Sequence, residues 1–230
     1  MKTLLLLLIL AGVLVADGPG VIVSHHIKAE FALTPDPNGP AWKGVAGVFA
    51  ENDPFGKPVP GHRTEIRSRW TDQNIYFLFV CPYETLHLKP NPELKQETNG
   101  LWEWDVAEVF VGTDFQNIKR YKEFEISPRG EWVDLDIDRS NPHPEGGWLW
   151  NSGMENQARI DEKNKVWYGV MKIPLKSIDS RTPANGIEMR VNLYRCQAKD
   201  PGRIYIAWQP TRSPSFHTPT AFGKLVLKGK

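Results

Sequence analysis

Short runs of alternating apolar and polar residues, separated by turn-forming residues, dominate the chain after residue 26. The clearest pair lies at residues 64–70 and 75–81, which are rich in β-branched and aromatic residues and flank the polar residues 71–74. Two such runs about a polar tetrapeptide predict a β-hairpin. Similar runs occur at residues 106–111, 122–126, 132–138, 166–173, 188–194, 204–208 and 224–227. Their spacing predicts an all-β fold, an antiparallel β-sandwich of jelly-roll-like form.

Helical periodicity is scarce, and only residues 174–180 suggest a short helix. Residues 84–100, which are polar and contain prolines, and residues 141–151 predict long loops. A rigid β scaffold usually carries its binding site on such loops. Because no repeat or low-complexity linker divides the chain, we expect one domain at residues 27–228, with residues 17–26 as a lead-in.

The N-terminus has the pattern of a secretory signal. Lys2 precedes an apolar stretch at residues 4–15, and Ala16 ends it. A positive start, a short apolar region and a small residue predict a signal peptide at residues 1–16. The stretch is shorter than the ~20 apolar residues of a membrane span. We therefore expect a secreted or periplasmic protein, with an uncleaved anchor as the alternative.

The overall charge is balanced. The chain has 28 Lys and Arg against 27 Asp and Glu, and Lys2 is the one charge in residues 1–16. Removal of the signal thus leaves a formal net charge of zero. Proteins that bind nucleic acid or anionic membranes usually carry a basic excess. We therefore expect no nucleic-acid partner and no membrane contact beyond the signal.

Two cysteines remain, Cys81 and Cys196. In an oxidising compartment such a pair can form a disulfide, which requires their strands to be neighbours. The sequence leaves a disulfide and two buried free thiols equally open.

The hairpin at residues 122–138 carries many acids. A four-residue turn pairs Ile126 with Glu131, which would place one acidic set with a tryptophan on the outward face. That set is Glu123, Glu125, Trp132, Asp134, Asp136 and Asp138. It is consistent with a solvated face, with a sugar-binding or calcium-binding surface, or with a glycosidase carboxylate pair.

Other familiar chemistries lack their motifs. The six histidines show no zinc-binding spacing, and the chain has no nucleophile elbow, no P-loop and no dinucleotide-binding glycine motif.

The chain contains nine tryptophans, and the aromatic residues that lie in predicted loops are its strongest functional signal. Trp42, Trp70, Trp167 and Trp208 are expected to pack in the core. A second group lies in predicted loops: Trp102, Trp104, Trp148, Trp150 and Phe216. Aromatic rings stack on the apolar C–H faces of sugars, and polar neighbours then bind the hydroxyls. The loop aromatics thus favour a sugar site. The alternative is that these rings only pack against the ends of the sandwich and close them.

Several segments together resemble the family 9 carbohydrate-binding modules. In chain order they are Arg67-Ser68-Arg69-Trp70-Thr71-Asp72, Leu101-Trp102-Glu103-Trp104-Asp105-Val106-Ala107-Glu108, Tyr121-Lys122-Glu123-Phe124-Glu125, Trp167-Tyr168-Gly169-Val170, Val191-Asn192, Trp208, and Phe216-His217-Thr218-Pro219 before Phe222-Gly223-Lys224-Leu225. The likeness covers about 160 residues, from Thr64 to Leu227.

The resemblance implies a β-sandwich that binds sugars, often at the ends of plant polysaccharide chains, with structural calcium in some members. Its two sugar-stacking aromatics correspond to Trp102 and Phe216, although the family has Trp at the second position. Glu125 stands where the family has a basic residue. An Asp of the family corresponds to a position near Cys81 in this chain. The matching candidate calcium ligands are Asp105 and Glu108. Weaker candidates for the rim of the site are Trp104, Trp150, His217, Glu125 and Arg195.

The sequence therefore predicts an exported, non-catalytic carbohydrate-binding module that recognises a poly- or oligosaccharide of plant type and serves carbohydrate catabolism, with a separate glycoside hydrolase as a possible partner. Two alternatives stay open. One is a glycoside-active enzyme that uses carboxylates of the 122–138 hairpin. The other is an envelope interaction protein that has lost sugar binding.

Overall fold

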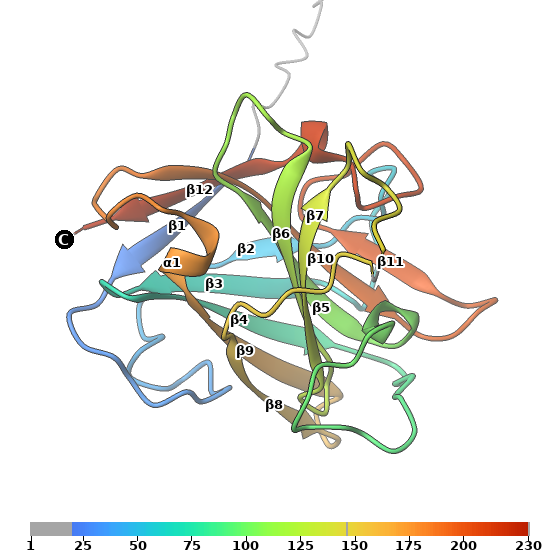
Figure 1. The fold of residues 1–230 in the computed structure, drawn as a ribbon. Helices are drawn as coiled ribbons and strands as arrows, with labels where there is room; N and C mark the ends of the chain where they lie inside the picture. Colours follow the sequence, from blue (N-terminus) through green and yellow to red (C-terminus); the bar gives the residue numbers. More distant parts are fainter. Residues whose placement is uncertain (1–19, 146, 230) are drawn as a thin grey trace, which may run out of the picture.

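The computed structural model describes residues 20–145 and 147–229, so the expected signal at residues 1–16 lies outside the described residues. The described chain is nearly all β (Figure 1). Its strands are β1 Val21–His26, β2 Val48–Ala50, β3 Thr64–Trp70, β4 Asn74–Pro82, β5 Val106–Gly112, β6 Arg120–Ile126, β7 Trp132–Asp138, β8 Glu155–Asp161, β9 Val166–Pro174, β10 Glu188–Gln197, β11 Ile204–Ala207 and β12 Gly223–Lys228. One helical turn, α1 Leu175–Ile178, and two 3-10 turns, η1 Leu101–Glu103 and η2 Pro219–Ala221, complete the fold.

The strands form one continuous sheet that curls into a near-barrel (Figure 1). Their order is β7-β6-β5-β10-β12-β1-β3-β4-β9-β8, with β11 on β10 and β2 on β3. The two edges approach one another where Gly130, in the β6–β7 turn, lies beside Asn156 and Ala158 of β8. The all-β expectation is confirmed, and the two separate layers of a sandwich are replaced by this single curled sheet.

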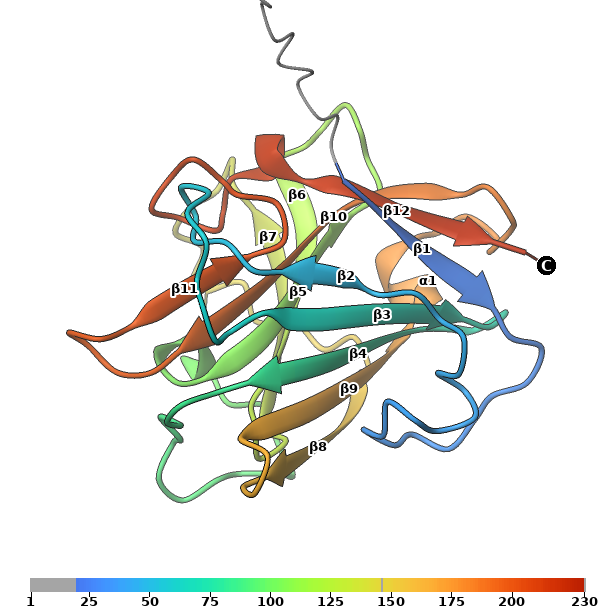
Figure 2. The ribbon, with the colours of Figure 1, turned by 180° about the vertical axis from the view of Figure 1, so that it is seen from behind.

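β1 corrects two expectations. It pairs in parallel with β12 and with β3, and Figure 2 shows it between them. The sheet is therefore not wholly antiparallel, and the expected lead-in at residues 17–26 contains a central strand. Ile22 and Ser24 of this strand are fully buried. The turn-forming residues Asp17-Gly18-Pro19-Gly20 stand directly before this strand in the sequence, so a signal for its start was present.

The β3–β4 hairpin and the helical turn α1 are confirmed, as are the long loops at residues 84–100 and in the described part of 141–151. The sequence pattern did not predict two further strands, β2 and β8. β2 is only three residues long, and β8 is a largely exposed edge strand with few apolar residues. An edge strand that buries little has no need of the alternation by which strands are recognised.

The expected register of the β6–β7 hairpin is wrong by one residue. Ile126 pairs with Trp132, not with Glu131. Glu131 belongs to the turn, since its backbone carbonyl accepts a hydrogen bond from the amide of Ser127 at 2.9 Å. A shift of one residue transfers a strand's side chains to the other face of the sheet. The expected acidic face is therefore divided between the two sides of the sheet.

Three apolar clusters stabilise the fold. The main core is enclosed by the curled sheet and contains Trp70 and Trp167. A second cluster lies on the outer face of β5, β6, β7 and β10, and includes Phe110, Val133 and Tyr194. A third packs residues of the loop after β1 against β4 and β9. The expected burial of Trp42, Trp70, Trp167 and Trp208 is confirmed, with at most 8% of each exposed.

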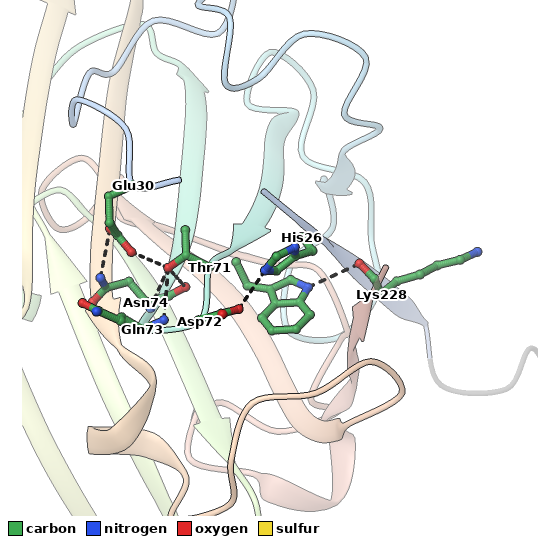
Figure 3. Close-up of polar contacts among 8 residues, drawn as sticks. His26, Glu30, Thr71, Asp72, Gln73, Asn74 and Lys228 are labelled. Atoms are coloured by element: carbon green, nitrogen blue, oxygen red, sulfur yellow. Dashed lines mark hydrogen bonds and ion pairs between the residues drawn. The ribbon is translucent and has the colours of Figure 1, made fainter. Parts of the chain in front are cut away.

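Glu30 fastens the segment after β1 to the turn between β3 and β4 (Figure 3). Its carboxylate accepts hydrogen bonds from the Thr71 hydroxyl at 2.5 Å and from the Asn74 amide at 3.0 Å. On the other side of the same turn, His26 Nε2 lies 2.9 Å from an Asp72 carboxylate oxygen. The polar turn thus anchors the N-terminal part of the domain.

Cys81 and Cys196 are both buried free thiols, which decides between the two alternatives for this pair. Cys81 lies on β4, whose neighbours are β3 and β9, whereas Cys196 lies on β10. The two strands are not adjacent, and the two residues belong to different apolar clusters.

Candidate functional site

A cavity of about 820 Å³ opens on the outer face of β5, β6 and β10. Its walls come from four parts of the chain that are far apart in the sequence: residues 99–104, residues 142–144 with 147–149, residues 199–205 and residues 214–217. In Figure 1 these segments gather on the side of the sheet that carries β11. The cavity therefore lies where loops meet a rigid sheet, the usual position of a binding site.

Aromatic residues form much of the cavity wall. Those in contact with it are Trp102, Trp104, Phe110, Trp148, Tyr205 and Phe216. Trp102 is 38% exposed and Tyr205 is 41% exposed, so each presents a large ring surface to solvent. Because exposed aromatic surface costs free energy in water, its concentration in one cavity marks a binding surface.

Arg203 holds the segment that carries Trp102. Its guanidinium donates hydrogen bonds to the backbone carbonyls of Trp102, of Glu103 at 3.1 Å and of Trp104 at 3.3 Å. A fourth bond goes to the carbonyl of Ala198 at 3.1 Å. The planar guanidinium thereby joins η1 to the β10–β11 connection and restrains the exposed indole.

Trp104 is positioned from the other side by His87, whose ring lies 4.4 Å from the indole between ring centroids. The next residue, Asp105, is buried and accepts hydrogen bonds from the amides of His87 and Ala198 at 2.9 and 2.6 Å. The side chain of Gln197 donates a third at 2.9 Å. Asp105 thus connects the loop before η1 to the end of β10.

Phe216 lies flat on Tyr194 of β10, with ring centroids 4.0 Å apart and an angle of 12° between the planes. The Tyr194 hydroxyl donates a hydrogen bond to the Phe216 carbonyl at 3.1 Å. Tyr205 meets Phe216 edge-on at 5.7 Å between centroids. One face of the Phe216 ring is therefore covered by a buried tyrosine, and the residue also contributes to the cavity wall.

Carboxyl groups lie beneath the aromatic walls. Glu108 of β5 and Glu123 of β6 both line the cavity, although only 2% and 3% of their surfaces are exposed. Glu108 accepts a hydrogen bond from the Cys196 thiol at 3.2 Å. Glu125 is paired with Glu108 across the two strands and is fully buried. These three acids form the carboxyl cluster of the site.

Burial dominates the electrostatics of the carboxyl cluster. It raises the pKa of Glu108 to about 7, and burial together with the charge of Glu108 raises the pKa of Glu123 to about 8. The pKa of Glu125 is raised well above its usual value by burial and by both neighbouring acids. Close acids in a poorly solvated site cannot all ionise, so they retain protons near neutral pH. A protonated carboxyl donates one hydrogen bond and accepts others, which suits a hydroxyl ligand.

His217 closes the cavity next to Glu123. Its Nδ1 lies 2.8 Å from the Tyr121 hydroxyl and 3.9 Å from a Glu123 carboxylate oxygen. Burial, with a smaller contribution from Arg139, lowers the pKa of His217 to about 4. The imidazole is therefore neutral at physiological pH, so it does not neutralise Glu123.

The structure brings four of the seven expected ligand residues to the cavity. These are Trp102, Phe216, Trp104 and His217. Glu108, expected as a calcium ligand, also lies in the wall.

Glu125, Arg195 and Trp150 do not reach the cavity, which corrects their expected place at its rim. Arg195 is fully buried and donates to the Pro82 carbonyl at 2.6 Å. Trp150 packs on the main core, and the Lys122 ammonium lies 4.2 Å from its ring centroid. Alternation alone could not place these side chains, because it does not tell which face of the sheet the loops cover.

Calcium binding at Asp105 and Glu108 stays a prediction. Three protein groups donate hydrogen bonds to the Asp105 carboxylate, which therefore has a structural role in this protein. Within residues 20–145 and 147–229, no three His, Cys, Asp or Glu side chains are grouped so as to hold a metal ion.

Three residues of the site were missed from the sequence: Arg203, Tyr205 and His87. Tyr205 lies in a run that alternates like any strand, and Arg203 precedes it as one charge among many. His87 has no metal-binding spacing, and it acts instead by packing on Trp104. Only the meeting of distant segments makes these residues recognisable.

Comparison with known proteins identifies the family. A family model described as "Carbohydrate family 9 binding domain-like" matches residues 41–230. The chain belongs to this family. A relative of this family 9 domain, named "Extracellular protein", comes from Arthroderma benhamiae and is 24% identical over an alignment of 226 residues; the match covers 93% of this chain and 96% of the relative.

Solved structures share the fold of this family 9 domain. A family 9 module from Caldicellulosiruptor kristjanssonii in complex with cellotriose has a TM-score of 0.67 at 13% identity, covering 92% of this chain and 95% of that one. A putative carbohydrate-binding protein from Bacteroides uniformis has a TM-score of 0.70 at 16% identity, covering 92% and 100%. In the part of the domain that the structure describes, no helix has the length and hydropathy needed to cross a bilayer.

Proposed function

We propose that this protein is an exported, non-catalytic carbohydrate-binding domain that stacks a sugar ring on the aromatic walls of its cavity. The observation that carries the proposal is the presence of Trp102 and Phe216 in the wall of one cavity. Both rings are held by the protein before any ligand arrives, Trp102 through Arg203 and Phe216 through Tyr194. A binding site assembled in advance loses less entropy when it takes its ligand.

The two parts of the cavity match the two sides of a sugar. The aromatic rings suit the C–H faces, and each stacked ring contributes about 1 kcal/mol beyond area burial. The carboxyls of Glu108 and Glu123 suit the hydroxyls, because they line the cavity as acceptors that also retain protons near neutral pH.

We further propose a glucan of plant type as the ligand and export as the destination. Support for the ligand comes from the similar family 9 modules, whose structures contain cellotriose and glucose. Support for export comes from the relative named an extracellular protein and from the expected signal. A separate glycoside hydrolase would then supply or consume the bound chain ends, as expected for carbohydrate catabolism.

The test is titration of the purified protein with glucose, cellotriose and xylotriose, followed by tryptophan fluorescence and by calorimetry, with and without calcium. We expect saturable binding of a glucose-based ligand, weakened at least about tenfold in Trp102→Ala, since that change removes a stacking ring. The matched control is Phe115→Ala, because Phe115 is 46% exposed and does not line the cavity. Binding to Trp102→Ala as tight as to the wild type would contradict the proposal.

Absence of catalysis is tested separately. Cello-oligosaccharides incubated with the protein should keep their length, as measured by chromatography. Shortened products that disappear in Glu123→Gln would instead favour a glycoside-active enzyme.

A further inference from the structure

Tyr205 is an exposed aromatic residue of the cavity that the stacking of one sugar ring leaves without a function. It lines the cavity and is 41% exposed, slightly more than Trp102 at 38%. Trp102 and Phe216 already supply the two rings of the proposed function, and a single pyranose has only two faces to stack. A further exposed ring in the same cavity therefore points to a longer ligand.

Large exposed apolar side chains occur on three separate walls of the cavity. They are Trp102 in residues 99–104, Leu149 in residues 147–149 and Tyr205 in residues 199–205. The cavity volume of about 820 Å³ lies in the upper part of the range of ligand pockets, about 300–1,000 Å³. One sugar ring fills only part of this space, and its two faces cannot cover three walls.

Tyr205 is positioned before a ligand binds. It lies on β11 and pairs with Cys196 of β10, so its backbone belongs to the sheet. Its ring meets Phe216 edge-on, with 5.7 Å between the ring centroids, and the guanidinium carbon of Arg203 lies 5.4 Å from its centroid. Arg203 also holds the segment that carries Trp102. Tyr205 thus stands beside the proposed stacking position and needs little ordering when a ligand arrives.

Polar groups stand close to Tyr205 in the same segment of the chain. Lys199 and Asp200, in the connection between β10 and β11, are exposed and line the cavity. An ammonium donates hydrogen bonds and a carboxylate accepts them, so together they suit the hydroxyls of a sugar ring. This wall therefore combines an aromatic platform with polar groups that can fix the orientation of a second ring.

We infer that Tyr205 forms a second sugar-binding position, on which the next ring of a chain stacks while the first ring occupies the position of Trp102 and Phe216. The preferred ligand is then an oligosaccharide or a segment of a polysaccharide, and a monosaccharide binds more weakly. The inference rests on the proposed function and adds the length of its ligand. Direct contact of Tyr205 with the second ring and mere support of Phe216 predict different results.

The experiment compares glucose, cellobiose and cellotriose by calorimetry on the wild type and on two variants of Tyr205. We expect cellobiose to bind the wild type about fivefold tighter than glucose, the gain of one further stacked ring. Cellotriose should bind at least as tightly as cellobiose. Tyr205→Ala should abolish the difference between cellobiose and glucose, whereas Tyr205→Phe keeps the ring and should keep the difference. Support of Phe216 alone would instead lower both affinities by the same factor in Tyr205→Ala.

Two controls separate this inference from the proposed function. Phe115→Ala removes an exposed aromatic residue that does not line the cavity, and the difference between the sugars should persist in it. Thermal melting of each variant reports its folding, and the comparison of sugars on the wild type needs no variant. Equal binding of the three sugars to the wild type, or a difference that persists in a folded Tyr205→Ala, would overturn the inference but not the proposed function. Failure of all three sugars to bind would overturn the inference together with the proposed glucan ligand.

Discussion

Phe216 lies parallel to Tyr194, with ring centroids 4.0 Å apart. Tyr194 is 1% exposed and belongs to the second apolar cluster, so the sheet itself supports this part of the cavity wall. The Tyr194 hydroxyl accepts from the Asn192 amide at 2.7 Å and donates to the Phe216 carbonyl. A buried strand residue thereby holds a loop residue through both its ring and its hydroxyl.

Tyr194→Phe should loosen this support without removing it. The stacked ring remains, but the bond to the Phe216 carbonyl is lost and the buried Asn192 amide loses one of its two acceptors. We expect sugar affinity to fall about threefold and the free energy of unfolding to fall by about 1 kcal/mol, the usual worth of a hydrogen bond. Calorimetry and denaturant unfolding measure the two effects. An unchanged affinity would show that the hydroxyl does not restrain the loop.

Phe216→Ala and Phe216→Trp should act in opposite directions. Alanine removes the ring, and we expect affinity to fall about tenfold. Tryptophan enlarges the stacking surface and should hold or raise the affinity if its larger ring is accepted over Tyr194. Titration of both variants with the same sugar checks the order Trp, Phe, Ala, and any other order argues against stacking on this residue.

Arg203→Lys should weaken sugar binding indirectly, through the position of Trp102. An ammonium cannot reproduce the planar fork that reaches the carbonyls of Trp102, Glu103, Trp104 and Ala198. We expect about a fivefold loss of sugar affinity, because Trp102 is no longer restrained, with a small decrease in melting temperature. The matched control is Arg63→Lys, an exposed arginine paired with Glu51, which should change neither.

Stability should fall as the pH rises from about 5 to about 8, and it should level off above that. Glu108 and Glu123 have pKa values of about 7 and 8 in the folded state, raised by burial from 4.5. Between the unfolded pKa of 4.5 and these folded values, the folded state binds more protons than the unfolded state, so stability falls with pH; above them both states are ionised and the dependence ends. His217, with a pKa lowered to about 4, has the opposite effect, but only below its unfolded value of 6.5.

Melting temperatures across this range measure the effect, and Glu123→Gln should flatten the profile. A profile that rises with pH in the wild type would mean that the carboxyls are ionised in the folded protein at neutral pH.

The two thiols should be inert in the folded protein. Cys81 and Cys196 are buried, and burial raises the pKa of Cys81 to about 12 and that of Cys196 well above its usual value. Because the thiolate is the reactive form, labelling should be slow until the protein unfolds. Mass spectrometry should find two labels after denaturation without a reductant, and reductant should not change the melting temperature. Labelling that requires a reductant would indicate a disulfide.

Much of this site was predictable from local sequence. Trp102, Trp104 and Phe216 stand in loops where strand packing cannot explain them, and all three line the cavity. Arg203 gave no such signal, because its function depends on carbonyls about one hundred residues away in the chain. Arg195 was misplaced for the related reason that an arginine at the end of a strand can point to either face.

The sequence by itself determined the all-β class, most of the strands and the family, because alternation, turn residues and ordered motifs are properties of neighbouring residues. Tertiary structure alone decided that Glu123 and Glu125 are buried beside Glu108 instead of facing solvent, since distant loops cover the outer face of the sheet at this point. One extra residue in the β6–β7 turn also moves the apolar residues of β7 to this face. It also decided the parallel place of β1 and the meeting of four distant segments around one cavity. These features depend on contacts between segments that are far apart in the sequence. The free energy that stabilises such contacts comes from the whole curled sheet, so no single segment of the sequence reveals them.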